Sequence, residues 1–156
     1  MLKFQSRLLS SHKLAVNNSS DLALKKIVEC FDAPIRFCAA YGSGVFPQET
    51  PGTVLGKEPI VDLIFGVTHA QHWHSLNIRQ NPHHYSYLRF LGSKAVETVQ
   101  CRFGAGIYYN TNCIVAGRSI KYGVITISDL LDDLRDWDTL YCAGRMQKPV
   151  RTLLGA

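Results

Sequence analysis

The chain has 156 residues, 46% of them hydrophobic and 19% charged, which is enough for one domain with a core but too short for two. Lys3, Arg7 and Lys13 supply +3 of the net charge of +5, which leaves +2 for everything after residue 20. Because the chain after residue 20 is only weakly basic, nucleic-acid binding is not expected to be its main activity. This charge suits the binding of an anionic small molecule or a lipid headgroup.

The first twenty residues have the composition of a mitochondrial targeting segment. They are rich in Ser, basic and free of acidic residues, and their apolar residues would lie broadly opposite the cations on a helix. A frayed polar N-terminus is the alternative interpretation of the same composition. We expect residues 1–20 to be the targeting segment and residues 21–156 to form the folded domain.

Helices and strands are predicted from the spacing of apolar residues and from capping and breaking residues. The predicted helices cover residues 21–30, 69–81, 93–103 and 129–137, the last one capped by Ser128. The predicted strands cover residues 35–40, 60–67, 106–109, 113–116 and 118–126. Residues 47–59 contain three prolines and two glycines and are predicted to be a loop. This order predicts an α+β fold with a mixed sheet rather than a doubly wound one.

The turns of the second half fix which residues should share a face. Asn110-Thr111-Asn112 is predicted to turn the chain between two strands, and Ala116-Gly117 to connect to the next strand. Alternation in that next strand should place Ile120, Tyr122 and Val124 on one face of the sheet and Lys121 on the other.

The strongest functional signal is a pair of strand-associated elements. Gly42-Ser43-Gly44 follows the first predicted strand, and Asp62 is a carboxylate within the apolar run of the second. Glycine backbone can approach an anion closely, and a buried carboxylate needs a partner or a metal ion. Alone, the first is also a tight turn and the second a strand-end cap or ion-pair partner, and Pro47 rules out a P-loop. Together they favour a phosphate and Mg²⁺ site for a nucleotide.

The histidines gather in one stretch, which raises the question of zinc. Their spacing is poor for a tetrahedral site, because no HExxH motif or nearby Cys pair completes a ligand set. The five Cys residues of the chain form no CxxC pair and are typical of reduced, mostly buried thiols in an intracellular compartment. The clustered histidines are His69, His72, His74, His83 and His84.

Two groups of basic residues are further candidates. Arg79, His83, His84 and Tyr85 lie within residues 63–96, which contain no acidic residue, so they suit phosphate oxygens, although bonding to local backbone is the simpler role. Lys121 lies in an apolar strand and needs an anionic partner, which is either Asp62 or a ligand phosphate. The later cations fit an anion-binding rim and a solvated tail equally well: Arg145, Lys148 and Arg151.

Six sequence blocks resemble one family. They are AYGSGVFPQ, VDLIFGV, HSLNIRQNPHHYS, GAGIYYN, IKYGVI and LYCAGRMQKPV, between Ala33 and Val150. In this order they are similar to the mitochondrial CDP-diacylglycerol synthases, the phosphatidate cytidylyltransferases of the translocator-assembly-and-maintenance type. The resemblance implies a nucleotidyltransferase-like fold and the Mg²⁺-dependent conversion of CTP and phosphatidic acid into CDP-diacylglycerol and pyrophosphate. It also implies peripheral attachment to the matrix side of the mitochondrial inner membrane and a role in cardiolipin synthesis.

The resemblance also implies roles for individual residues. Gly42, Ser43 and Gly44 would bind the phosphates of CTP, Asp62 would hold the metal, and Lys121 would neutralise charge on the phosphates. Positioning and charge neutralisation would carry the catalysis, since the phosphatidate phosphate is already an anion. The remaining expected contacts are His83, His84 and Tyr85 on the nucleotide or phosphatidate side, and Arg79, Arg145 and Lys148 at a phosphate or lipid headgroup.

Two departures from the family pattern bear on function. Nucleotidyltransferases commonly present an Asp-x-Asp pair, but position 64 is Ile, so a second metal ligand would come from elsewhere, from the substrate, or not exist. Family members also continue into a helical region with a basic C-terminal stretch, which we expect to be absent from a shortened form. The alternative function is therefore an inactive fragment that acts as an inner-membrane assembly or interaction protein. A nucleotidyltransferase for RNA or protein hydroxyls would need a more basic groove.

Overall fold

The computed structural model describes residues 20–46 and 59–155. The expected targeting segment and most of the predicted 47–59 loop therefore lie outside the described residues. A helix over residues 20–29 opens the described chain. The elements that follow are β1 (Phe37–Tyr41), β2 (Val61–Val67), α2 (Ala70–Gln80), the 3₁₀ helices η1 (Pro82–His84) and η2 (Tyr87–Leu91), α3 (Ser93–Arg102), β3 (Ile107–Val115), β4 (Arg118–Thr126), α4 (Ile127–Asp136), α5 (Tyr141–Met146) and β5 (Val150–Leu154).

The five strands form one sheet in the order β3-β4-β2-β1-β5. β2 and β4 are parallel, and the other neighbouring pairs are antiparallel. This confirms the predicted α+β class and the mixed sheet. It also confirms that the glycine turn and Asp62 belong to neighbouring strands, since Tyr41 at the end of β1 pairs with Asp62.

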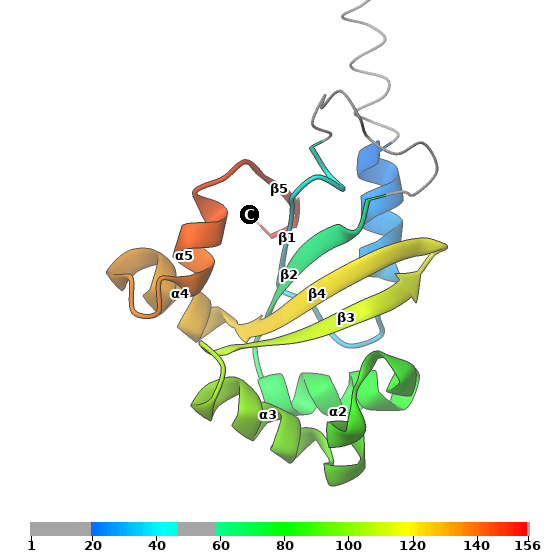
Figure 1. Ribbon diagram of the computed structural model, residues 1–156, viewed down its shortest axis with the longest axis vertical. Helices are drawn as coiled ribbons and strands as arrows, with labels where there is room; N and C mark the ends of the chain where they lie inside the picture. The colour runs from blue at the N-terminus through cyan, green and yellow to red at the C-terminus, as the bar shows by residue number, and fades with distance from the viewer. Residues whose placement is uncertain (1–19, 47–58, 156) are drawn as a thin grey trace, which may run out of the picture.

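The helices divide between the two faces of the sheet (Figure 1). The helix over residues 20–29, α2 and α3 cover the face that holds the larger core. Its centre is aromatic: the Phe31 ring lies 5.0 Å from that of Phe65 and 5.1 Å from that of Tyr122, and the Trp73 side chain is 1% exposed. The predicted alternation in β4 is confirmed, because Ile120, Tyr122 and Val124 all belong to this core.

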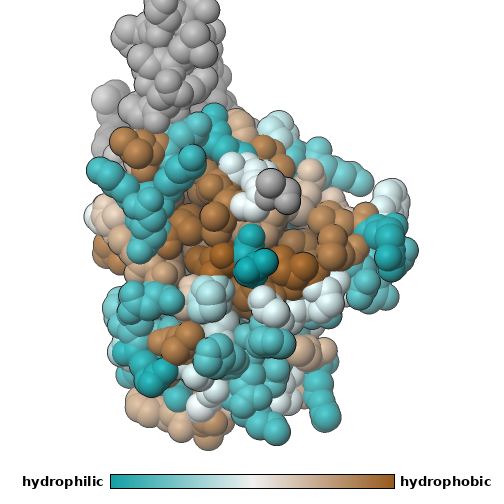
Figure 2. All heavy atoms as spheres, turned by 180° about the vertical axis from the view of Figure 1, so that it is seen from behind, coloured by the Kyte–Doolittle hydropathy of each residue, from teal (hydrophilic) through white to brown (hydrophobic). Residues whose placement is uncertain are grey.

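The opposite face carries α4 and α5 over a smaller core that includes Ile64, Ile125, Leu130 and Cys142. Part of its apolar surface stays open. A surface groove of about 610 Å³ runs beside this core, lined mainly by Phe37, Ile127, Leu130, Leu131 and Leu134. Figure 2, the view from behind, shows apolar side chains gathered over the middle of the molecule.

The predicted turn at residues 110–112 is wrong, since β3 runs without interruption from Ile107 to Val115. An irregularity in the β3–β4 pairing lies between Asn110 and Cys113 instead, and Asn112 has a positive φ of 57°. A bulge inserts an extra residue and so reverses the alternation of faces. As a result Tyr109 faces the smaller core while Cys113, four residues later, faces the larger one.

Two more differences from the sequence analysis lie in the C-terminal part of the chain. The N-cap of α4 is Thr126 rather than Ser128, because the Thr126 hydroxyl accepts a hydrogen bond from the Asp129 N–H at 3.1 Å. Residues 141–146 and 150–154, for which no helix or strand was predicted, form α5 and the edge strand β5. These segments are too short for a periodic signal and are stabilised by packing on the rest of the fold.

Within the part of the chain that the structure describes, no helix combines the length and the apolar character needed to cross a bilayer.

Candidate functional site

The glycine turn after β1 lies directly against the start of β2. Gly42 has a φ of +81°, and a Cβ added to it would lie 2.9 Å from Oδ2 of Asp62. A Cβ on Gly44 would lie 2.3 Å from the carbonyl oxygen of Ile60, so a side chain is sterically excluded there. The N–H groups of Val45 and Phe46 both donate to the Gly42 carbonyl, at 3.1 and 2.9 Å. The turn and the carboxylate are thus immediate neighbours.

Asp62 is half-buried beside two cations. Burial raises the pKa of its carboxyl, and the positive charges of Lys121 and Arg145 act in the opposite direction. Lys121 lies on the neighbouring parallel strand, paired in register with Asp62. Within residues 20–46 and 59–155 no ion pair within 4.0 Å joins the carboxylate to either cation. The carboxylate and the two cations therefore keep their charges available to a ligand.

Three tyrosines surround the cations. The Lys121 Nζ lies 4.7 Å from the centre of the Tyr109 ring. The guanidinium carbon of Arg145 lies 4.7 Å from the Tyr141 ring and 5.8 Å from the Tyr41 ring, and Nη2 of Arg145 donates to the Tyr141 hydroxyl at 2.9 Å. These distances are typical of cation–π contacts.

Arg145 is brought to the site by α5, and a buried carboxylate holds α5 in place. Asp133, on α4 and 1% exposed, accepts hydrogen bonds from the N–H groups of Cys142 and Ala143 at 2.7 and 2.9 Å. It also accepts from the N–H and the hydroxyl of Thr139, at 2.7 and 2.8 Å. Burial alone raises the pKa of Asp133, but these hydrogen bonds outweigh it and hold the pKa below its usual range.

Six of the predicted site residues therefore gather on one face of the sheet. The Gly42 turn, Asp62, Lys121 and Arg145 combine close backbone, one carboxylate and two cations. Mg²⁺ is commonly bound by one or two carboxylates together with substrate phosphates. The donor set fits such an ion, since Asp62 borders on glycine rather than on a hydrogen-bonding side chain. The members of this group are Gly42, Ser43, Gly44, Asp62 and Lys121, with Arg145 beside them.

The predicted contacts on η1 lie on the opposite face of the sheet. Neighbouring residues of a strand face opposite ways, so Tyr122 points away from the site that Lys121 faces. His84 Nδ1 lies 2.9 Å from the Tyr122 hydroxyl, and the Tyr85 hydroxyl lies 2.9 Å from Nδ1 of His74. The sheet thus separates His83, His84 and Tyr85 from Asp62, and their expected place on the nucleotide or phosphatidate side stays a prediction.

These groups belong to a buried hydrogen-bond network instead. His74 is 0% exposed, and its Nε2 lies 2.9 Å from Oε1 of Gln100 on α3. The Asn77 amide donates to the hydroxyls of Tyr85 and Tyr122, at 3.0 and 2.8 Å. Burial lowers the pKa of His74 to about 4, against a smaller opposing effect of the Gln100 hydrogen bond. The network joins α2, η1, α3 and β4 in a neutral form.

The other predicted cations also separate. Arg151, on β5, donates from Nη1 to the Asp21 carboxylate at 2.6 Å and so ties the edge strand to the helix over residues 20–29. Lys148 and Arg79 are exposed, and Arg79 lies in the last turn of α2, on the other side of the sheet. Of the three cations of the expected rim, Arg145 thus lies close enough to act on the Asp62 carboxyl, and Arg151 is paired with Asp21 instead.

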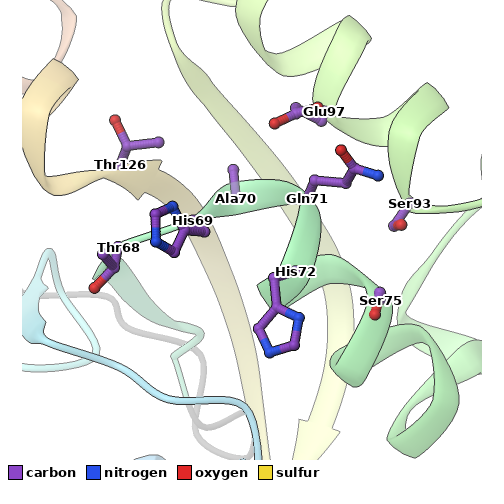
Figure 3. Close-up of a pocket in the computed structure, with 9 residues that line it drawn as sticks. All are labelled: Thr68, His69, Ala70, Gln71, His72, Ser75, Ser93, Glu97 and Thr126. Atoms are coloured by element: carbon purple, nitrogen blue, oxygen red, sulfur yellow. The ribbon is translucent and has the colours of Figure 1, made fainter.

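His69 and His72 line a different hollow, a groove of about 510 Å³ at the start of α2 (Figure 3). Thr68 and Thr126, near the carboxyl ends of the parallel strands β2 and β4, and Glu97 of α3 complete much of its lining. Among the described residues no group of three or more His, Cys, Asp or Glu side chains could hold a metal ion. The histidine-rich stretch is thus divided among a groove, a core and a surface.

Sequence reasoning missed the tyrosines of the site. Tyr41 and Tyr109 lie within the recognised blocks, and their hydroxyls lie 3.3 Å apart although two strands, β4 and β2, separate β3 from β1. Nothing in a linear pattern pairs residues 68 positions apart. The signal that could have been used is the Tyr-rich GAGIYYN block itself, whose second tyrosine directly precedes a polar Asn.

Fold and site together define an α+β domain with a carboxylate and two cations on a partly open sheet face. A family model described as mitochondrial phosphatidate cytidylyltransferase matches residues 24–155. The chain belongs to this family, as its six sequence blocks predicted.

Curated relatives with the same description support this. The chain is 47% identical to the mitochondrial phosphatidate cytidylyltransferase of Schizosaccharomyces pombe over 85% of its own length and 33% of the relative's. It is 42% identical to the Saccharomyces cerevisiae protein, over 92% of this chain and 37% of the relative. It is also 42% identical to the Homo sapiens protein, over 86% of this chain and 30% of the relative. The chain thus spans about a third of the length of these relatives.

Proposed function

We propose that this chain carries the nucleotide-transfer part of a phosphatidate cytidylyltransferase. In the reaction, a phosphate oxygen of phosphatidic acid attacks the α-phosphorus of CTP, the bond to the β-phosphate oxygen breaks, and pyrophosphate leaves. CDP-diacylglycerol is the product. On this proposal the mixed sheet and its helices form a nucleotidyltransferase-like fold. Family membership and the names of the relatives support the reaction, and the site geometry supports the assignment of residues.

The observation that carries the proposal is the contact between the glycine turn and Asp62. A Cβ at Gly42 would lie 2.9 Å from the Asp62 carboxylate, so a phosphate held by the turn and a metal ion held by the carboxylate would be neighbours. The Mg²⁺ ion supplies charge neutralisation of the phosphates when bound. Asp62 would hold it, and the backbone of Gly42, Ser43 and Gly44 would face the triphosphate.

Lys121 and Arg145 would neutralise the charge that the pyrophosphate gains as it leaves. Both lie on the same sheet face as Asp62 and influence its carboxyl electrostatically. No general base is required, because the attacking phosphate is already an anion. His83, His84, Tyr85 and Arg79 take no part in this proposal.

The cellular setting follows from the same proposal. The relatives are described as mitochondrial, and we propose that this protein acts peripherally on the matrix side of the inner membrane, supplying CDP-diacylglycerol for cardiolipin synthesis.

The decisive experiment is turnover of labelled CTP on phosphatidate liposomes with Mg²⁺. The 156-residue chain is compared with a longer family member, such as the S. pombe relative, as a positive control. Formation of labelled CDP-diacylglycerol by both supports the proposal. If the chain neither turns over nor binds CTP while the longer protein does, the proposal fails for this chain.

A non-enzymatic role is the second candidate, and one observation favours it. Asp62 is a single carboxylate, without a metal-binding cluster in the described part of the chain. An inactive chain that acts as an inner-membrane assembly or interaction protein would have no use for a nucleotide. Isothermal titration calorimetry with CTP and Mg²⁺ separates the two, because such a protein should give no heat of nucleotide binding.

A further inference from the structure

Lys121 and Arg145 are held by aromatic rings rather than by carboxylates. Within the described residues the ion pairs lie elsewhere, on α4 and between Arg151 and Asp21. The two cations instead share one neighbour: the Tyr109 ring lies 4.7 Å from Nζ of Lys121 and 6.0 Å from the guanidinium carbon of Arg145.

The position of the Tyr109 ring is itself fixed from several sides. Tyr109 pairs across the sheet with Gly123, and a Cβ there would lie 2.8 and 2.9 Å from ring carbons Cε1 and Cζ of Tyr109. The ring therefore lies on the sheet where β4 has no side chain. Its hydroxyl is 3.3 Å from that of Tyr41, and its centre is 6.0 Å from the Tyr141 ring.

This arrangement has a consequence for ligand binding. A cation paired with a carboxylate is neutralised and must break that pair before it meets a phosphate. A ring face attracts a cation weakly but leaves its positive charge uncompensated for a ligand. The Tyr109 phenol stays neutral, because burial and the neighbouring Tyr41 and Tyr141 hydroxyls raise its pKa.

We infer that Tyr109 is a positioning residue, which holds Lys121 and Arg145 at a fixed separation so that both bind the polyphosphate of the nucleotide. This rests on the proposed function. The ring does not contact the reacting atoms; it acts through the two cations.

The test compares Tyr109→Leu with Tyr109→Phe, because phenylalanine keeps the ring and leucine does not. Binding of CTP with Mg²⁺ and of inorganic pyrophosphate is measured by calorimetry on the full chain. We expect Tyr109→Leu to weaken both by roughly tenfold, the size of two weak cation–π contacts, and Tyr109→Phe to stay within about threefold of the original chain, the effect of one hydroxyl contact. Equal binding by the original chain and a folded Tyr109→Leu variant overturns the inference.

Tyr108 is the matched control. It is the adjacent residue of β3 but faces the other side of the sheet, where its ring stacks 6.0 Å from that of Tyr85. Tyr108→Leu should lower thermal stability and leave pyrophosphate affinity unchanged. A similar loss of affinity in both leucine variants would mean that general destabilisation, rather than the Tyr109 ring, is responsible.

A second variant and a ligand-free signal keep the test informative. Gly123→Ala should displace the ring and weaken pyrophosphate binding as Tyr109→Leu does. In NMR spectra without ligand, the side-chain methylenes of Lys121 should show an upfield ring-current shift that Tyr109→Phe keeps and Tyr109→Leu loses. If the original chain binds no CTP but shows this shift, the proposed function fails while the ring still positions the lysine; absence of the shift overturns the positioning itself.

Discussion

The two faces of the sheet are built from the same strands and yet differ in kind. One face is closed by three helices over a core of large aromatic side chains, and several of its polar groups are hydrogen-bonded to each other. The other face, at the start of β2, presents Asp62, Lys121 and Arg145, which are only half-buried and have no ion-pair partner among the described residues. Alternate residues of β2 and β4 thus serve stability and function separately.

The difference teaches where this fold tolerates uncompensated charge. On the closed face a polar group such as His74 is neutral and doubly hydrogen-bonded. On the open face the cations contact the faces of aromatic rings, and the Asp62 carboxylate lies next to Gly42. Changes to the closed face should therefore affect folding, whereas changes to the open face should affect binding and turnover.

The largest effect is expected from Asp62→Asn. If Asp62 holds the metal, its loss should reduce CTP turnover on phosphatidate liposomes by about 10³-fold or more, since charge neutralisation by a metal is worth several kcal/mol. Thermal unfolding should be unchanged or slightly improved, because burial already disfavours the charged form of this carboxyl. Substantial turnover by the variant would rule out Asp62 as the metal ligand.

Trp73→Ala tests the closed face in the opposite sense. Trp73 is 1% exposed and touches several aromatic rings, so its truncation should lower the free energy of unfolding by about 3–5 kcal/mol. Urea denaturation measures the loss. Tyr87→Ala, at a side chain that is 87% exposed, is the control and should change stability by less than about 0.5 kcal/mol.

His74 should make the closed face sensitive to acid. Its pKa is about 4 in the folded chain and about 6.5 when unfolded. The unfolded state therefore takes up the proton first, and stability should fall as the pH falls from about 6.5 to 4, by on the order of 3 kcal/mol. Urea denaturation at several pH values should show this slope, and His74→Gln should reduce it, leaving the part due to His84, whose pKa burial also lowers to about 4; an unchanged slope would assign the effect to other groups.

Asp133→Asn tests whether the site on the open face depends on a carboxylate that lies outside it. An amide cannot accept all four hydrogen bonds that Asp133 accepts from Thr139, Cys142 and Ala143, so we expect a loss of about 1–3 kcal/mol in stability. Because α5 carries Arg145, pyrophosphate affinity should also fall. Asp132→Asn, at an exposed position on the same helix, should leave both unchanged.

The smallest effect should come from Asp21→Asn, which breaks the ion pair with Arg151. Both side chains are partly exposed, so the loss should be at most about 1 kcal/mol and should diminish in high salt. A much larger loss of thermal stability would show that the edge strand depends on this pair more than its exposure suggests.

Long periodic segments were predictable because their signals are local. The core strands β2 and β4 and the helices α2 and α3 were found within about two residues of their bounds, since buried faces impose a repeat on the sequence. The bulge at residues 110–113, the short α5 and the edge strand β5 carry no such repeat. Their conformation depends on partners elsewhere in the chain, as Asp133 shows for α5.

The candidate site divides in the same way. The Gly42 turn and Asp62 are recognisable by residue type, because few residues can approach an anion or bind magnesium. Lys121 is recognisable as a charge in an apolar strand. The sequence does not reveal that Arg145 lies beside Tyr41 and Tyr109. It also does not reveal that His84 and Tyr85 lie on the opposite side of the sheet.

By itself the sequence determined the α+β class, the family, and the two strands that carry the glycine turn and the carboxylate. These features follow from local sequence patterns and from the chemistry of single residue types. Only the tertiary structure decided which charges share a face. That depends on strand register, on a single bulge and on the docking of a six-residue helix, all of which arise from contacts between residues far apart in the chain.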